Sequence, residues 1–183
     1  MLLLLPLVLL LPRAADAQYS PVHRGSIQLA GTAQLSHFRD IGNDFSSSVI
    51  ELAPRLGYFV APGLALNANL QFRHDASEVA AATQWGVGPG LTYYVSGLSR
   101  RVYPFVSGRT LFTWSHAWDG SGVVLDRRNS TSWLVSSGAL VLLAEHVGLT
   151  AELYYQHDRF TVEPSTNSDE QYGLQWGFAI FVH

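Results

Sequence analysis

Five charged residues share one face of segments in which apolar residues alternate with small or polar ones. Three are arginines and two are glutamates: Glu51, Arg55, Arg73, Arg109 and Glu152. If these segments are β-strands around an enclosed interior, the charges must be paired, because an isolated ion is costly to remove from water. We predict a structural network of ion pairs in a lumen. The alternative is a switch in which one glutamate exchanges arginine partners.

Four histidines and two arginines form a second group, at the ends of the same segments. The group comprises His37, Arg39, His74, His116, His157 and Arg159. The alternation places the histidines on the outward face of alternate strands, which lie about 10 Å apart and diverge. One metal ion cannot bind ligands so far apart, so we expect no metal site. We interpret the group as a belt at a lipid headgroup boundary, with binding of lipopolysaccharide phosphates by its arginines as a further hypothesis.

Eight segments of the alternating kind are bounded by Gly, Pro, Asn, Asp or Ser. Each is long enough to cross a bilayer as a tilted strand, which takes about 9 to 11 residues. The connections alternate between longer and shorter, which is typical of an outer-membrane barrel. The segments cover residues 26–37, 48–60, 64–74, 83–95, 102–114, 132–143, 147–157 and 172–182. The longer connections cover 38–47, 75–82, 115–131 and 158–171, and the shorter ones 61–63, 96–101 and 144–146.

This pattern predicts an all-β fold, an eight-stranded antiparallel up-and-down transmembrane β-barrel. We expect short periplasmic turns, longer extracellular loops and both termini in the periplasm. Leu, Val, Ile and aromatic residues would face lipid, and aromatics near segment ends, such as Phe59, would form interfacial girdles. The charges, with Tyr94, Leu140 and Leu142, are expected to plug a narrow lumen. A soluble lipocalin-like barrel is the alternative, and the polar inner face counts against it.

Residues 1–17 are predicted to be a secretory signal peptide and residues 18–183 the barrel domain. The first twelve residues are apolar, and Ala15 and Ala17 form an A-x-A cleavage pattern. The apolar stretch is shorter than the roughly 20 residues of a spanning helix. The chain has no cysteine, which excludes disulfides and thiol chemistry. With a net charge of −3 and no basic stripe, nucleic acid is not an expected partner.

The segment from Pro54 to Leu66, PRLGYFVAPGLAL, resembles a hairpin of the outer-membrane β-barrel superfamily that includes the outer membrane protein A transmembrane domain. Segments 86–91 and 138–153 are similar to its later hairpins, so the resemblance covers most of the mature chain. It departs at the C-terminus, where family members usually end in Phe and this chain ends Phe181-Val182-His183. That terminal Phe is part of the signal read by the barrel assembly machinery, an expected partner during biogenesis.

We expect a monomer in the bacterial outer membrane, with outer-membrane lipids and lipopolysaccharide as partners. We predict a structural or surface-interaction role, and the alternative is a narrow solute channel gated by luminal Arg/Glu pairs. A lipid A deacylase or acyltransferase comes third, because Ser115-His116 and His157-Asp158 offer suitable residue types. Adjacent residues of a strand point to opposite faces, however. We therefore predict no catalytic residue, no cofactor and no enzyme activity.

Overall fold

The computed structural model describes residues 21–40, 45–77, 80–96, 99, 101–119, 124–162 and 165–182. The predicted signal peptide lies outside the described residues. Eight strands follow one another along the chain. They are β1 (Ile27–Asp40), β2 (Phe45–Ala61), β3 (Leu64–Ser77), β4 (Ala80–Tyr94), β5 (Val102–Asp119), β6 (Val124–Ala144), β7 (Val147–Val162) and β8 (Ser165–Val182).

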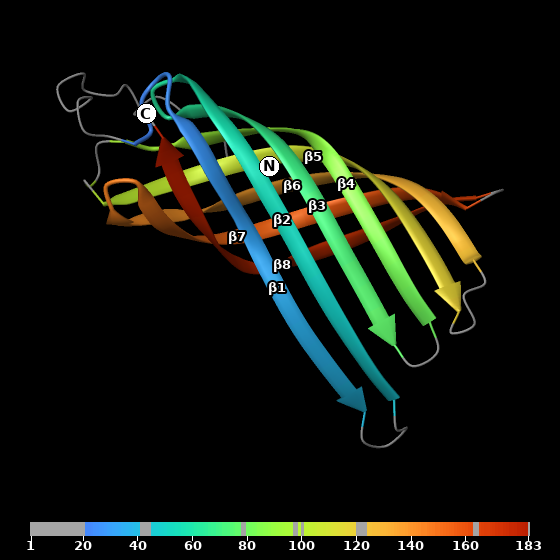
Figure 1. The fold of residues 1–183 in the computed structure, drawn as a ribbon. Helices are drawn as coiled ribbons and strands as arrows, with labels where there is room; N and C mark the ends of the chain where they lie inside the picture. Colours follow the sequence, from blue (N-terminus) through green and yellow to red (C-terminus); the bar gives the residue numbers. More distant parts are fainter. Residues whose placement is uncertain are drawn as a thin grey trace, which may run out of the picture.

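The strands form one barrel in sequence order, which the pairing of β1 with β8 closes (Figure 1). All neighbouring strands are antiparallel. This arrangement confirms the predicted all-β, eight-stranded, up-and-down barrel. Within the ranges given above, no helix is long and apolar enough to cross a membrane.

Successive residues of each strand alternate between the interior and the exterior of the barrel, as the pleat requires. On β2 and β3, Arg55, Asn67 and Asn69 are buried, whereas Leu56 and Leu66 are more than half exposed. A soluble barrel has the opposite arrangement, with its charged and polar side chains in water. The described exterior instead presents a band of exposed Leu, Val, Ile and aromatic side chains, which suits contact with lipid.

The two ends of the barrel differ in how far the strands extend. At the terminal end, where β1 starts and β8 finishes, β2 and β3 are separated only by residues 62 and 63. At the opposite, distal end, the strands continue into the segments predicted as longer loops. β5 and β6 remain paired as far as Trp118↔Val124, so most of segment 115–131 is β-hairpin. The apolar alternation stops earlier because successive residues such as Ser115 and His116 are polar on both faces, whereas the backbone ladder continues.

The ladder that closes the barrel is short. β1 pairs with β8 only from Ile27↔Val182 to Gly31↔Phe178, which is five residue pairs. β1 continues to Asp40 in contact with β2, and β8 starts at Ser165 in contact with β7. Figure 1 shows β1 (blue) and β8 (dark red) adjacent near the C-terminus and diverging toward the distal end. We refer to the facing edges of these two strands as the β1–β8 seam.

Candidate functional site: the barrel lumen

Buried apolar side chains form a cluster inside the barrel at the terminal end. Phe59, Tyr94 and Leu140 are completely buried. The ring centroids of Phe59 and Tyr94 lie 5.8 Å apart, and those of Tyr94 and Phe105 lie 5.4 Å apart. Such tilted aromatic pairs stabilise a core by about 0.5–1.5 kcal/mol beyond the area they bury. We call this cluster the apolar plug; it consists of Val22, Ala30, Phe59, Ala65, Tyr94, Tyr103, Phe105, Leu140, Leu142, Ala179 and Phe181.

The plug includes part of the chain that precedes β1. Val22 is 1% exposed, and its carbonyl oxygen accepts a hydrogen bond from the Gly63 N–H at 2.8 Å. The Gly25 N–H donates to the Phe59 carbonyl at 2.9 Å, and the Phe59 N–H donates to the Ser26 carbonyl at 3.0 Å. Backbone bonds therefore hold the residues before β1 against the end of β2 and the turn that follows it.

Sequence reasoning predicted the inward positions of Tyr94, Leu140 and Leu142 but placed Phe59 in an exterior girdle. Phe59 is completely buried in the plug instead. The alternation could have shown this, because Phe59 is in phase with Arg55, an expected luminal residue. The proximity of Phe59 to a strand end was the misleading feature.

A layer of hydrogen-bonded polar side chains lies next to the plug. The Gln28 Nε2 donates to the Tyr94 hydroxyl at 2.7 Å, which ties this layer to the plug. The Asn67 Nδ2 donates to the Thr92 hydroxyl at 2.8 Å, and that hydroxyl donates to the Ser107 hydroxyl at 3.0 Å. The first bond crosses the interior from β1 to β4. The other two join the neighbouring strands β3, β4 and β5, and all three restrict the side chains involved.

Glu152 is 4% exposed and binds neutral donors. Its carboxylate accepts hydrogen bonds from the Ser136 hydroxyl at 3.0 Å and from the Gln175 amide. The charges of Glu152, Arg55 and Glu51 all act on the Arg109 guanidinium. Two cations and one buried anion thus share the middle of the lumen.

Arg55 and Arg109 have incomplete hydrogen bonding. In the part of the chain that the structure describes, neither Nε has a hydrogen-bond partner, although both atoms are buried. Three buried amide oxygens in the same region also lack one, those of Gln28, Asn67 and Asn69. Buried donors and acceptors of this kind are commonly bridged by internal water.

Arg73 forms ion pairs in the distal part of the lumen. Its Nη1 lies 3.6 Å from the Glu51 carboxylate, and its Nε donates to the Asp75 carboxylate at 2.9 Å. The Gln71 Nε2 donates to Glu51 at 3.2 Å. Asp75 was missing from the predicted network, yet its position two residues after Arg73 on a strand places both on the same face.

The five predicted luminal charges therefore fall into separate groups. Glu51 contacts Arg73, while Glu152 binds Ser136 and Gln175. Arg55 and Arg109 lie near these charges but form no ion pair within 4.0 Å among the described residues. A continuous network of ion pairs remains a prediction.

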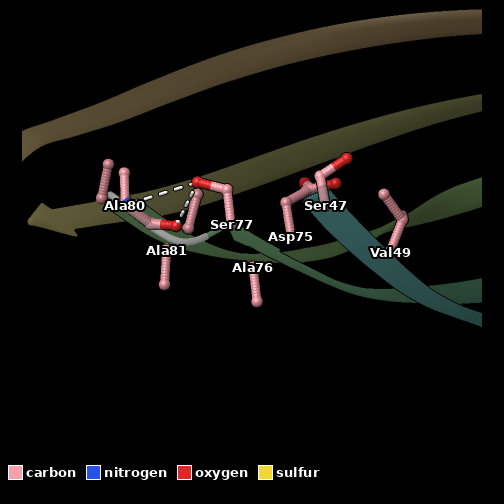
Figure 2. Close-up of a pocket in the computed structure, with 9 residues that line it drawn as sticks. Ser47, Val49, Asp75, Ala76, Ser77, Ala80 and Ala81 are labelled. Carbon is pink, nitrogen blue, oxygen red and sulfur yellow. Dashed lines mark hydrogen bonds between the residues drawn. The ribbon is translucent and has the colours of Figure 1, made fainter. Parts of the chain in front are cut away.

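A hollow of about 230 Å³ lies on the inner wall near the distal hairpins, lined by residues of β2 to β5. Figure 2 shows that Asp75, Ser77 and Ala80 point to one side of the sheet, whereas Ala76 and Ala81 point to the other. Ser77 and Ala80 are joined by two hydrogen bonds at the end of the hairpin. The small side chains leave this part of the lumen wide.

The predicted histidine belt is a row of separate contacts on the exterior. The His37 ring bonds the Ser48 hydroxyl at 2.9 Å, and the His74 ring bonds the Thr83 hydroxyl at 2.8 Å. His157 stacks on Trp133 at a centroid distance of 5.8 Å and lies 3.8 Å from the Glu170 carboxylate. The remaining members are His116 and Arg159, which are exposed, and Arg39, whose side chain is outside the described part. No group of three or more metal-binding side chains occurs among the described residues.

Comparison with solved structures shows which proteins have a similar architecture. The chain matches neisserial surface protein A with a TM-score of 0.61 and 16% identity, covering 85% of this chain and 96% of that one. It matches the N-terminal β-barrel domain of Pseudomonas aeruginosa OprF with a TM-score of 0.56 and 13% identity, covering 87% and 98%. It matches the outer membrane protein OprG of the same species with a TM-score of 0.54 and 13% identity, covering 90% of this chain and 99% of that one. The chain has the fold of eight-stranded outer-membrane β-barrels.

Similarity in structure, and not similarity in sequence, shows this outer-membrane barrel fold. No family model matches the chain, and no curated protein matches it. Identities of 13% to 16% leave the role of the barrel open. The resemblance inferred from the hairpin at Pro54 to Leu66 is confirmed at the level of the fold.

The outer-membrane barrel holds the suggested hydrolase residues apart. Ser115 lies opposite Gln84, and His116 lies opposite Thr83, so the two residues face opposite sides of the wall. The Asp158 carboxylate accepts hydrogen bonds from the Gln156 amide, on the face opposite to His157. Neither pair forms a nucleophile and base in this geometry.

Proposed function

We propose that this protein is a bacterial outer-membrane β-barrel with a structural or surface-interaction role and a lumen that does not conduct solutes. In this proposal the terminal end faces the periplasm, and the distal hairpins extend outside the cell. The apolar exterior and the fold support the location. The apolar plug is the single observation that carries the functional part.

The plug opposes conduction for a simple physical reason. An ion that crosses it must leave water in a region where side chains such as Phe59, Tyr94 and Leu140 have no exposed surface. Desolvating an ion without a compensating partner is costly. A barrel of this size has an interior that side chains can fill, and the buried apolar cluster at the terminal end supports such filling here.

Conductance in planar lipid bilayers tests the proposal. We expect no sustained channels from the wild type. The double variant Phe59→Ala/Leu140→Ala should open a path, because it removes two buried side chains from the plug. The matched control is Tyr58→Ala/Val141→Ala, which truncates the adjacent exterior side chains and should remain silent. Stable channels from the wild type would contradict the proposal.

A narrow channel gated by luminal charges is the second candidate. It is favoured by Arg109, which lies near Arg55, Glu152 and Glu51 and whose Nε–H donates no hydrogen bond within the described part of the chain. A guanidinium with incomplete bonding can change partners more easily than one held in a bidentate pair. If Arg109→Ala and Glu152→Ala leave a measurable wild-type conductance unchanged, this candidate fails.

The exterior belt is proposed as a contact to lipopolysaccharide in the outer leaflet. Arg159 is exposed on the outward face, two residues beyond the stacked His157. An Arg39→Ala/Arg159→Ala variant should bind lipopolysaccharide vesicles more weakly, and unchanged binding would contradict the contact. In the same proposal, the barrel is a monomer that the barrel assembly machinery inserts.

A further inference from the structure

The β1–β8 seam leaves two strand edges without a neighbour. Residues 32–40 of β1 are paired with β2 on one side only, and residues 165–177 of β8 with β7 on one side only, as far as the described residues show. The other ladders extend into the distal hairpins, as from Val147↔Ile180 to Val162↔Ser165 between β7 and β8. In the described part of the wall, the missing strand pairing is therefore confined to the β1–β8 seam.

Side chains along the seam are exposed on both faces. Leu35 is 77% exposed, and Tyr172 is 85% exposed. Gln34 is exposed as well, although its position in the alternation points inward. Inward residues such as Glu51 and Arg73 are only partly exposed, so the exposure of Gln34 marks the missing neighbour.

An open seam is unfavourable where the wall crosses lipid. A backbone N–H or C=O left without a partner in hydrocarbon costs several kcal/mol, whereas water satisfies the same groups where the edges border a water-filled lumen or extend beyond the membrane. Free strand edges also tend to recruit another strand. A neighbour for these two edges is therefore expected, and the nearest candidate for each edge is the other one.

The two edges are complementary if the existing register continues. Extending Gly31↔Phe178 places Thr32 opposite Gly177 and then Gln34 opposite Gln175, both toward the lumen. It also places Leu35 opposite Leu174, both toward the exterior. Neither edge contains a proline, so no residue in them lacks the N–H that a ladder needs.

We propose that the β1–β8 seam is a lateral gate with two states. In the open state the two edges are unpaired beyond Gly31↔Phe178, as they are in this structure, and the distal half of the lumen would communicate sideways with the surroundings of the barrel. In the closed state, β1 and β8 pair along the continued register and complete the wall. The gate is independent of conduction through the barrel axis, because the plug lies at the opposite end.

Disulfide trapping tests the closed state, since the chain has no native cysteine. The double variant Gln34→Cys/Gln175→Cys is refolded in lipid vesicles and then oxidised. Directly opposed residues have Cα separations of about 4.5–5.5 Å, within the range that a disulfide spans. Ala30→Cys/Ala179→Cys is the positive control, because these residues are already opposed. Gln34→Cys/Gly173→Cys is the off-register control.

Distances between spin labels test whether both states exist. Labels at Leu35→Cys/Leu174→Cys should give two populations, one short and one long. Labels at Leu29→Cys/Ile180→Cys, which are opposed in the structure, should give a single short distance. We expect the in-register disulfide to form at least about ten-fold more than the off-register one, whose diagonal spacing exceeds the usual range.

Each alternative result overturns the gate. A single short distance at Leu35/Leu174 means that the seam is permanently closed. A single long distance with no in-register disulfide means that the edges never meet. Disulfide-linked dimers from Gln34→Cys alone or Gln175→Cys alone mean that the edges pair with a second copy of the chain instead.

Discussion

Replacing three glycines by alanine separates two costs of adding a side chain. Gly63 has a φ of 76°, and a Cβ there would overlap the Tyr94 carbonyl oxygen. Gly25 has a φ of 94° but nothing within 4 Å of an added Cβ. Gly108 has neither feature. The three variants therefore separate the cost of the left-handed backbone conformation from the cost of the clash between an added Cβ and the Tyr94 carbonyl.

The structure sets the expected sizes. Gly25→Ala should destabilise by about 1–2 kcal/mol, the cost of the left-handed conformation for a residue with a Cβ. Gly63→Ala adds a clash with backbone, at about 1–3 kcal/mol, for a total of roughly 2–5 kcal/mol. Moving the turn away would strain the bonds from the Gly63 N–H to Val22 and from the Tyr94 N–H to Gly63. Gly108→Ala should be neutral or stabilising by up to about 1 kcal/mol.

Urea unfolding in lipid vesicles, followed by tryptophan fluorescence, measures these differences. Heat-modifiable gel migration shows whether each variant folds. The reasoning is refuted if Gly63→Ala loses no more stability than Gly25→Ala, because the Tyr94 carbonyl would then not limit the site. It is also refuted if Gly108→Ala is as destabilising as Gly63→Ala.

Three further substitutions test the packing and the charges. Phe59→Ala should cost about 3–5 kcal/mol as a buried aromatic truncation; we expect Tyr58→Ala on the exterior to cost less, and equal losses in urea unfolding would contradict the plug. Glu152→Ala should cost about 1–3 kcal/mol, because it leaves the Ser136 hydroxyl and the Gln175 amide without their acceptor; a neutral result would contradict the importance of these two bonds. Arg73→Ala should change stability by only about 0–1 kcal/mol, since its ion pairs are partly exposed; a loss as large as that of Glu152→Ala would contradict this.

The sequence predicted the strands best where lipid and lumen impose opposite demands on the two faces. The expected segment 64–74 falls within β3, which runs to Ser77, and the segment 147–157 falls within β7, which runs to Val162. Both strands extend past the prediction at the distal end. There the alternation carries no information, because a hairpin in water does not need one apolar face.

The sequence predicted which side chains of the candidate site lie in the lumen, but it did not predict the residues that they contact. Alternation is enough to place Glu51, Arg73 and Glu152 inside the barrel. It cannot show that Glu152 binds Ser136, because that contact depends on the register between β6 and β7. Register is set by turns and by packing around the whole barrel. The sequence of a single strand therefore does not determine it.

The apolar plug also has a consequence for how the protein folds. It brings Val22, ahead of the first strand, into one cluster with Phe181, near the end of the last. Contacts so distant in sequence are slow to form, and the cluster is incomplete until β8 is in place. Closure of the terminal end should therefore be among the last steps of assembly, and an unfinished barrel would have an open mouth.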